Sequence, residues 1–167
     1  MGLDMYLYIK KVQYSPVHFY EKGAPTGLYP EELRGFEEKI LKRNFASVET
    51  TELCQVGYWR KANAIHDWFV KHCADGVDDC REMPVSISQL EELLNDCKKA
   101  LKSKGQASNI LPTSSGFFFG STDYDDWYFD NLEYTVELLT DVIKFITEHR
   151  TNDYKWPDYL VVYQASW

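Results

Sequence analysis

The sequence predicts one α+β domain in which a mostly antiparallel sheet packs against about four helices. Strand-like alternation begins almost at residue 1 and returns over residues 159–167, and several segments between them carry apolar residues at helical spacing. No repeat, linker or low-complexity tract divides the 167 residues, a length that fits a single domain spanning residues 1–167. Both terminal strands are therefore expected to be neighbours in one sheet.

The amino-terminal part predicts a strand, a loop and a helix. Leu3, Met5, Leu7 and Ile9 alternate with polar residues and tyrosines, the period of two of a strand with one buried face. Residues 14–30 contain three prolines and two glycines and indicate a loop. Pro30 then begins a charged helix, PEELRGFEEKILKRN, because proline is favoured in the first turn.

The middle of the chain predicts a strand followed by a helix, a turn and an edge strand. Residues 45–59 are rich in β-formers, and Gly57 marks a bulge or a close approach. A helix is expected over residues 60–72 and a turn over residues 75–79. The segment REMPVS indicates a short extended piece that Pro84 confines to a sheet edge or a strand end.

Two further helices and a strand complete the prediction. Ser86 or Ser88 caps a helix whose apolar residues recur at helical spacing, namely Leu90, Leu93, Leu94, Cys97 and Leu101. Residues 103–122 predict an ordered loop with a short strand at 116–119. A long helix follows over residues 125–150, and YLVVYQASW forms the last strand.

Composition excludes several classes of protein. A net charge of −8, from 26 acidic and 18 basic residues, argues against duplex DNA as a partner, because phosphate neutralisation needs Lys and Arg. The 16% aromatic content suits a packed core and also flat surfaces for ligands. No apolar run approaches a membrane span, no signal peptide is recognisable, and the cysteines form no C-x-x-C pair. We expect a cytoplasmic protein with reduced cysteines, no metal and no cofactor.

The segment VGYWRKANAIHDWFV, residues 56–70, is the first candidate site. On a helical wheel Trp59, Asn63 and His66 lie at the rim between a core face and a water face, where a ligand could reach them. Arg60 and Lys61 stand at the helix start, where backbone amides also favour anions. The alternative is structural: Asn63 and His66 bind neighbouring loops, and Trp59 belongs to the core.

The segment LPTSSGFFFGSTDYDDWYF, residues 111–129, is the second candidate site. Two glycines bracket three phenylalanines, and serines and acids follow, so backbone amides and side chains could both meet a ligand. The spacing of Thr122 and Asp125 also fits a helix cap without any ligand. The segment DGVDDCRE lacks the spacing of a calcium loop, and no known catalytic motif occurs.

Five blocks of the sequence resemble a family of small proteins common in bacteriophage and prophage genomes. They are MGLDMYLY, VGYWRKANAIHDWFV, DGVDDCRE, LPTSSGFFFGSTDYDDWYF and the closing YQASW. The resemblance covers both ends and most of residues 54–134, and residues 13–52 match least. It implies an accessory role in a bacterial cytosol and brings no catalytic residues with it.

Together these patterns predict a protein that binds and sequesters a small anionic ligand, such as a nucleotide signal of bacterial antiviral defence. Two alternatives stay open: an enzyme that pairs His66 with an aspartate from residues 75–79 or 123–126, and an acidic protein that inhibits a host enzyme by surface binding. Self-association is also left open. The predicted ligand-binding residues are Tyr58, Trp59, Arg60, Lys61, Asn63, His66, Phe118, Ser121 and Asp123.

Overall fold

A computed structural model describes residues 2–16, 47–149 and 159–167 of the chain. Their elements follow in the order β1 (Asp4–Pro16), β2 (Ser47–Arg60), α2 (Asn63–Cys73), β3 (Met83–Val85), α3 (Ile87–Lys102), a 3₁₀ turn (Lys104–Gln106), α4 (Ala107–Ile110), α5 (Asp126–Glu148) and β4 (Tyr159–Ser166). The helix predicted to begin at Pro30 lies outside the described residues.

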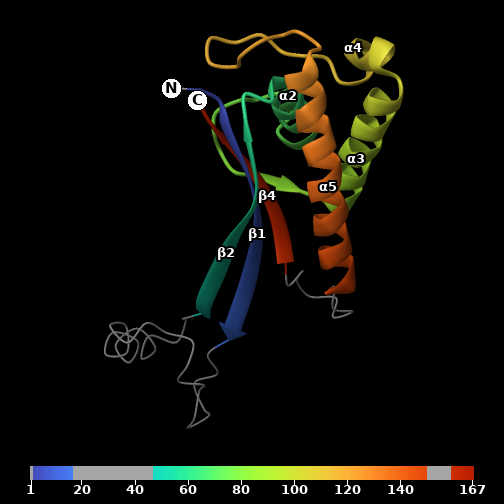
Figure 1. Cartoon of the computed structure of the whole chain (residues 1–167). Helices are drawn as coiled ribbons and strands as arrows, with labels where there is room; N and C mark the ends of the chain where they lie inside the picture. Colours follow the sequence, from blue (N-terminus) through green and yellow to red (C-terminus); the bar gives the residue numbers. More distant parts are fainter. Residues whose placement is uncertain (1, 17–46, 150–158) are drawn as a thin grey trace.

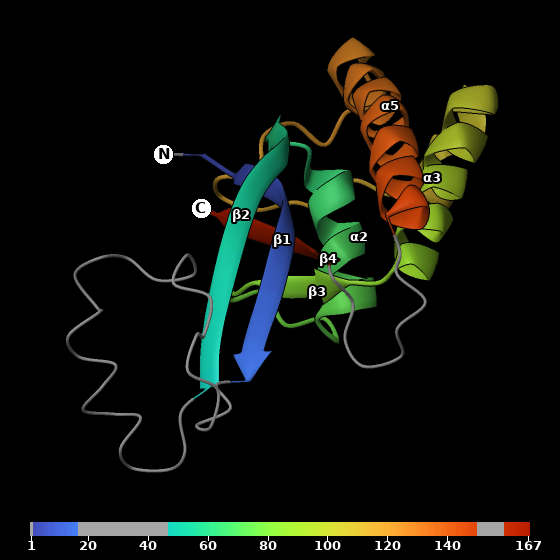
Figure 2. The same ribbon diagram turned by 90° about the horizontal axis from the view of Figure 1, so that it is seen from below.

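The four strands form one antiparallel sheet in the order β2-β1-β4-β3. The first and last strands of the chain are neighbours, with Met5 opposite Ala165 and Ile9 opposite Val161. Helices α2, α3 and α5 lie on one side of this sheet (Figures 1 and 2), and α3 packs along α5. The α+β class, the antiparallel sheet with both terminal strands and the count of about four helices are confirmed within the described residues.

The predicted apolar faces meet between the sheet and the helices. Alternate residues from Leu3 to Ile9 are buried, β4 buries Val161, Val162, Tyr163 and Ala165, and the helical stripes of α3 and α5 are buried as well. The side chains that form these stripes are Leu3, Met5, Leu7 and Ile9 of β1 and its start, Val161, Tyr163 and Ala165 of β4, Leu90, Leu93, Cys97 and Ala100 of α3, and Leu132, Leu139, Val142 and Ile146 of α5.

Gly57 marks a β-bulge, as its position predicts. The register of β2 against β1 shifts there, because Leu7 faces Gly57 while Tyr8 faces Gln55. A Cβ atom on Gly57 would lie 2.4 Å from Cδ2 of Leu138, so α5 approaches the strand closely at this point. The bulge thus lies where α5 packs on the sheet.

Three local predictions are wrong. β2 continues to Arg60, so the next helix begins at Asn63 rather than at residue 60. The predicted strand at residues 116–119 is a turn, in which the Phe119 amide donates to the Gly116 carbonyl. Asp125 itself caps α5 by accepting from the Tyr128 amide, so the predicted pairing of Thr122 with Asp125 is not the cap.

The four cysteines are free thiols in the structure. Their burial differs, from the exposed Cys54 to the buried Cys97. Burial raises the pKa of Cys73 to about 11, which keeps this thiol protonated and unreactive at neutral pH. Among the described helices, none is long and apolar enough to cross a membrane.

Candidate functional site

Lys61 stands at the junction between β2 and α2 in a backbone conformation that is rare for lysine. Its φ is 57°, and its amide donates to the Leu3 carbonyl at 2.8 Å, which holds the turn in place. The aliphatic stem packs against two glycines: a Cβ atom on Gly120 would lie 3.1 Å from the Lys61 Cβ, and one on Gly2 would lie 3.3 Å from its Cε. A left-handed lysine costs about 1 kcal/mol, so the surrounding contacts must enforce it.

Asn63 ties the two candidate segments together. Its amide nitrogen donates to the carbonyls of Phe119 at 3.1 Å and Ser121 at 2.8 Å, and its amide oxygen accepts from the Ser114 amide at 3.1 Å. Asn63 is only 3% exposed, and the loop engages both of its amide hydrogens and one lone pair of its amide oxygen. The loop that precedes α5 therefore lies against the start of α2 (Figure 1).

The loop is fastened at its base as well. Tyr128 of α5 donates its hydroxyl hydrogen to the Leu111 carbonyl at 2.7 Å, and the Thr113 hydroxyl donates to the Thr122 carbonyl at 2.9 Å. These bonds cross-link the two ends of residues 111–125. Hydrogen bonds from side chains to backbone carbonyls therefore hold this loop in place.

A shallow depression, open to solvent, lies between the starts of α2 and α5 and the loop. Four of the nine predicted ligand-binding residues line it: Lys61, Asn63, Ser121 and Asp123. Its other lining residues are Ala62, Ala64, Ile65, Thr113, Asp125, Trp127, Tyr128, Asn131 and Leu132. Among these Trp127, 57% exposed, offers a flat aromatic surface that we did not predict as a ligand contact.

The electrostatic character of the depression is mixed. Among the described residues, no side chain caps the start of α2, so its first amides carry a partial positive charge there. Lys61 adds a full positive charge and forms no ion pair with any residue that the structure describes. Asp123 and Asp125 supply carboxylates, which already accept from the Ser121 hydroxyl and the Tyr128 amide.

Three predicted residues of the strand end lie away from the depression. Trp59 belongs to β2 rather than to the helix, is 1% exposed, and donates from Nε1 to the Thr135 hydroxyl at 2.9 Å. Tyr58 donates its hydroxyl hydrogen to Asp4, and this bond raises the pKa of Tyr58. The Arg60 guanidinium lies 3.9 Å from the same carboxylate.

The three phenylalanines of the loop point to different environments. Phe117 is 96% exposed, and the Phe118 carbonyl accepts from the Leu3 amide at 3.1 Å. The Phe119 ring packs inward, edge to face with His66 at 5.1 Å between ring centres. Phe118 is not among the residues that line the depression.

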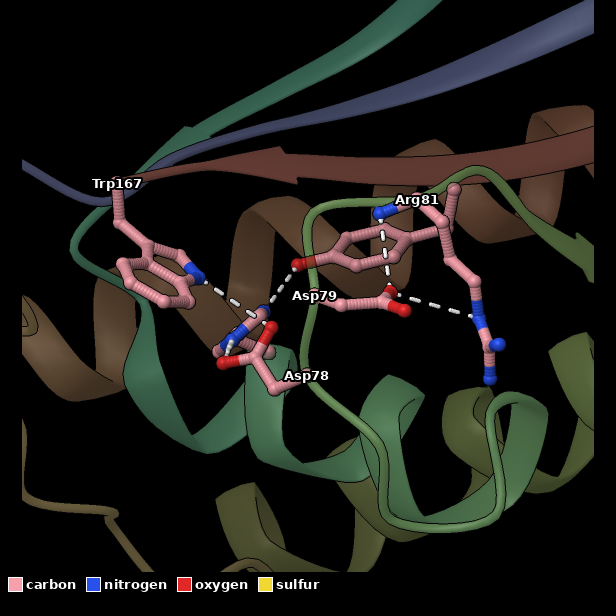
Figure 3. A network of polar contacts seen from close by, with 6 residues as sticks. Asp78, Asp79, Arg81 and Trp167 are labelled. Carbon is pink, nitrogen blue, oxygen red and sulfur yellow. Dashed lines mark hydrogen bonds and ion pairs between the residues drawn. The ribbon is translucent and has the colours of Figure 1, made fainter.

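His66 is buried and lies away from the depression, so the rim position predicted for it is wrong, whereas Asn63 is buried but lines the depression. The imidazole is 1% exposed, with Nδ1 2.8 Å from the Tyr163 hydroxyl and Nε2 3.0 Å from a carboxylate oxygen of Asp78. The pairing with an aspartate of residues 75–79, expected for the enzyme alternative, is present (Figure 3). Both ring nitrogens are occupied, and the ring does not reach the depression.

Gly116 permits the inward position of Phe119. A Cβ atom at residue 116 would lie 2.7 Å from Cγ of the Phe119 ring, which is itself held against His66 and Trp167. We expect Gly116→Ala to lower the free energy of unfolding by about 1–3 kcal/mol, as overpacking does. Chemical denaturation measures the change.

Gly105→Ala is the matched control, because no described residue beyond the chain neighbours lies within 4 Å of a Cβ atom at that position. This variant should leave stability unchanged or raise it by up to about 1 kcal/mol, since alanine restricts the unfolded chain. Equal effects of the two substitutions would show that Phe119 is not held as described.

Compared with protein-family models, curated proteins and solved structures, the chain gives no match.

Proposed function

We propose that this protein binds a small anionic ligand in the depression between the starts of α2 and α5. The observation that carries the proposal is the arrangement of Lys61. A lysine is held in a left-handed conformation at the mouth of a depression, without an ion-pair partner among the described residues. Strain of this kind is retained where the surroundings impose it, and such positions cluster at functional sites.

The surroundings of Lys61 support an anion. The uncapped amides at the start of α2 favour negative charge, and their effect adds to that of the ammonium group. Packing of the lysine stem on Gly120 and Gly2 restricts its rotamers, so less entropy is lost when an anion binds. A charge-assisted hydrogen bond of this type contributes about 1.5–3 kcal/mol.

The other lining groups support a ligand that also carries hydroxyls and a flat ring. Asp123 and Asp125 each retain carboxylate oxygen lone pairs that can accept from hydroxyls, and Trp127 offers its face for stacking. Phosphate, ribose hydroxyls and a base combine these features in nucleotides. The resemblance to phage proteins suggests the nucleotide signals of antiviral defence as the class to test.

Sequestration is favoured over turnover. The residues that line the depression include no histidine and no cysteine, and the His66–Asp78 pair lies in the interior. A general base must come within hydrogen-bond reach of the proton it removes, which the buried imidazole does not do here.

The test is titration calorimetry with inorganic phosphate, nucleoside monophosphates, cyclic dinucleotides and ADP-ribose-type nucleotides. Each complex is then heated and the released ligand is identified by mass spectrometry. Recovery of intact ligand supports sequestration, and an altered product supports catalysis. If no member of the panel binds, the proposal is wrong and the surface-inhibitor alternative gains support.

Lys61→Asn should weaken binding of the anionic ligand by about tenfold or more, since one charge-assisted bond is lost. Asparagine tolerates the left-handed backbone, so the fold should be retained. Arg60→Gln is the control, because it removes the same charge from the neighbouring residue, which does not line the depression. Its effect should stay within about twofold, as expected for a screened surface charge. Equal losses in both variants would mean that net charge rather than the depression sets affinity.

A further inference from the structure

Three side chains, two of them buried, form a continuous hydrogen-bonded chain. Asp78 Oδ2 lies 3.0 Å from His66 Nε2, and His66 Nδ1 lies 2.8 Å from the Tyr163 hydroxyl. Asp78 also accepts at Oδ1 from the Trp167 indole at 3.3 Å, and Figure 3 shows these two side chains facing each other. The chain joins the segment after α2, the body of α2 and the end of β4.

The two hydrogen bonds that link Asp78, His66 and Tyr163 contain one hydrogen each. A carboxylate accepts, so Nε2 carries the imidazole hydrogen, and Nδ1 accepts from the Tyr163 hydroxyl. Burial raises the pKa of Tyr163 well above its usual range, so this hydroxyl keeps its hydrogen. One added proton gives three hydrogens for two links, whether His66 or Asp78 receives it. The third hydrogen must then point from Tyr163 into the interior or displace Trp167 from Asp78.

The same chain supports the wall of the depression through Phe119. The Phe119 ring packs edge to face with the His66 imidazole at 5.1 Å and with Trp167 at 6.4 Å between ring centres. The Phe119 carbonyl is bound by Asn63, and two residues later Ser121 lines the depression. A rearrangement of the chain therefore acts on the part of the loop that would contact a ligand.

We propose that Asp78, His66 and Tyr163 form a proton-sensitive clamp that holds the loop of residues 111–125 against α2 and releases it when the chain takes up one proton. This inference rests on the proposed function, because the clamp would regulate ligand binding in the same depression. His66 and Asp78 act in it as positioning residues and do not contact the ligand.

Other titratable groups near the chain are few among the described residues. Tyr163 of β4 is influenced by Cys73 at the end of α2 and by Cys80, besides Asp78 itself. Asp79 is paired with Arg81 at 3.5 Å, and on α2 Asp67 is paired with Lys71 at 2.6 Å. Phe119, which covers the imidazole from the loop, does not titrate. Among these groups of the described residues, His66 is therefore the only imidazole.

The test needs no ligand, so its failure is distinguishable from failure of the proposed function. Amide hydrogen exchange is measured by NMR on the whole chain at pH 7.5 and 5.5, and corrected for intrinsic rates. The reporters are the Ser114 amide, bound by Asn63, and the Leu3 amide, bound by the Phe118 carbonyl. Their protection should fall about tenfold on acidification, because a buried hydroxyl without an acceptor is costly.

Two variants and one control assign this response. His66→Gln can donate to Asp78 and accept from Tyr163 without titrating, so protection should change by less than about twofold between the two pH values. Asp78→Asn keeps an acceptor but no charge, so the fall should move to lower pH, since a carboxylate stabilises an added proton. His72→Gln removes a histidine that bonds to the Trp68 carbonyl and should respond as the natural sequence does.

Three results would overturn the clamp: protection that does not change with pH in the natural sequence, an undiminished fall in His66→Gln, or a midpoint that does not move in Asp78→Asn. If His66→Gln fails to fold, the shift of the midpoint in Asp78→Asn decides. A purely structural role for Asp78 would lower protection at every pH and leave the midpoint in place.

Discussion

Asn63→Asp is expected to lower the free energy of unfolding by about 3 kcal/mol or more, because each lost bond to a buried polar group costs about 1–3 kcal/mol. The substitution preserves shape, but it replaces the amide nitrogen that donates to the carbonyls of Phe119 and Ser121. A carboxylate oxygen would face these two carbonyl oxygens in a site that is 3% exposed. Urea denaturation at pH 7 measures the loss.

The loop should also detach from α2 in this variant, so cleavage within residues 112–122 by a protease should become faster. Asn131→Asp is the matched control: Asn131 makes the same type of bond, to the Trp127 carbonyl at 2.6 Å, but the residue is only half-buried and the bond is open to solvent. Its effect on stability should stay within about 0.5 kcal/mol, as for most surface substitutions. A similar loss in both variants would contradict the role given to Asn63.

Periodicity predicted the elements of this fold because each one is a local pattern. The alternation of Leu3, Met5, Leu7 and Ile9 requires only neighbouring residues, and so does the helical spacing that begins at Leu90. The sequence also predicted that the two terminal strands are neighbours, and β1 pairs with β4, whereas the order of β2 and β3 in the sheet was not predicted. Burial of these faces in the structure therefore agrees with prediction.

The boundary between β2 and α2 was not predictable in the same way. The helical wheel treated Trp59 as part of the helix, whereas the left-handed Lys61 ends the strand and allows the helix to begin at Asn63. Lysine gives no sequence signal for this conformation, which glycine or asparagine would indicate. The shift moved Trp59 from a helix rim into the core.

The roles of the polar residues depend on partners far away in the sequence. Asn63 binds backbone groups 51 to 58 residues away, and His66 bonds to Tyr163, which is 97 residues away. The alternative stated for the sequence, in which Asn63 and His66 bind other parts of the chain rather than a ligand, describes these contacts. Lys61, Ser121 and Asp123 share one depression only because the Asn63 bonds hold the loop there.

Trp59→Ala is expected to lower the free energy of unfolding by about 4–5 kcal/mol, at the upper end of the range for a buried aromatic residue. The indole is 1% exposed and contacts the rings of Phe69 and Tyr163, with centres 6.3 and 6.5 Å away. Its Nε1 donates to the buried Thr135 hydroxyl, which also donates to the Asn131 carbonyl, so truncation leaves a cavity and removes one of the two hydrogen bonds of that hydroxyl. Thermal and urea unfolding measure this loss.

Trp59→Phe should recover most of this stability and retain a cost of about 1–2 kcal/mol for the missing bond to Thr135. Trp127→Ala is the opposite case: Trp127 is 57% exposed, so its removal should cost less than about 1 kcal/mol while weakening binding of an aromatic ligand in the depression. A Trp59→Ala variant that stays stable but loses binding would reverse these assignments. Comparison of Trp59→Ala with Trp127→Ala therefore distinguishes the tryptophan that packs between the sheet and α5 from the tryptophan that is available to a ligand.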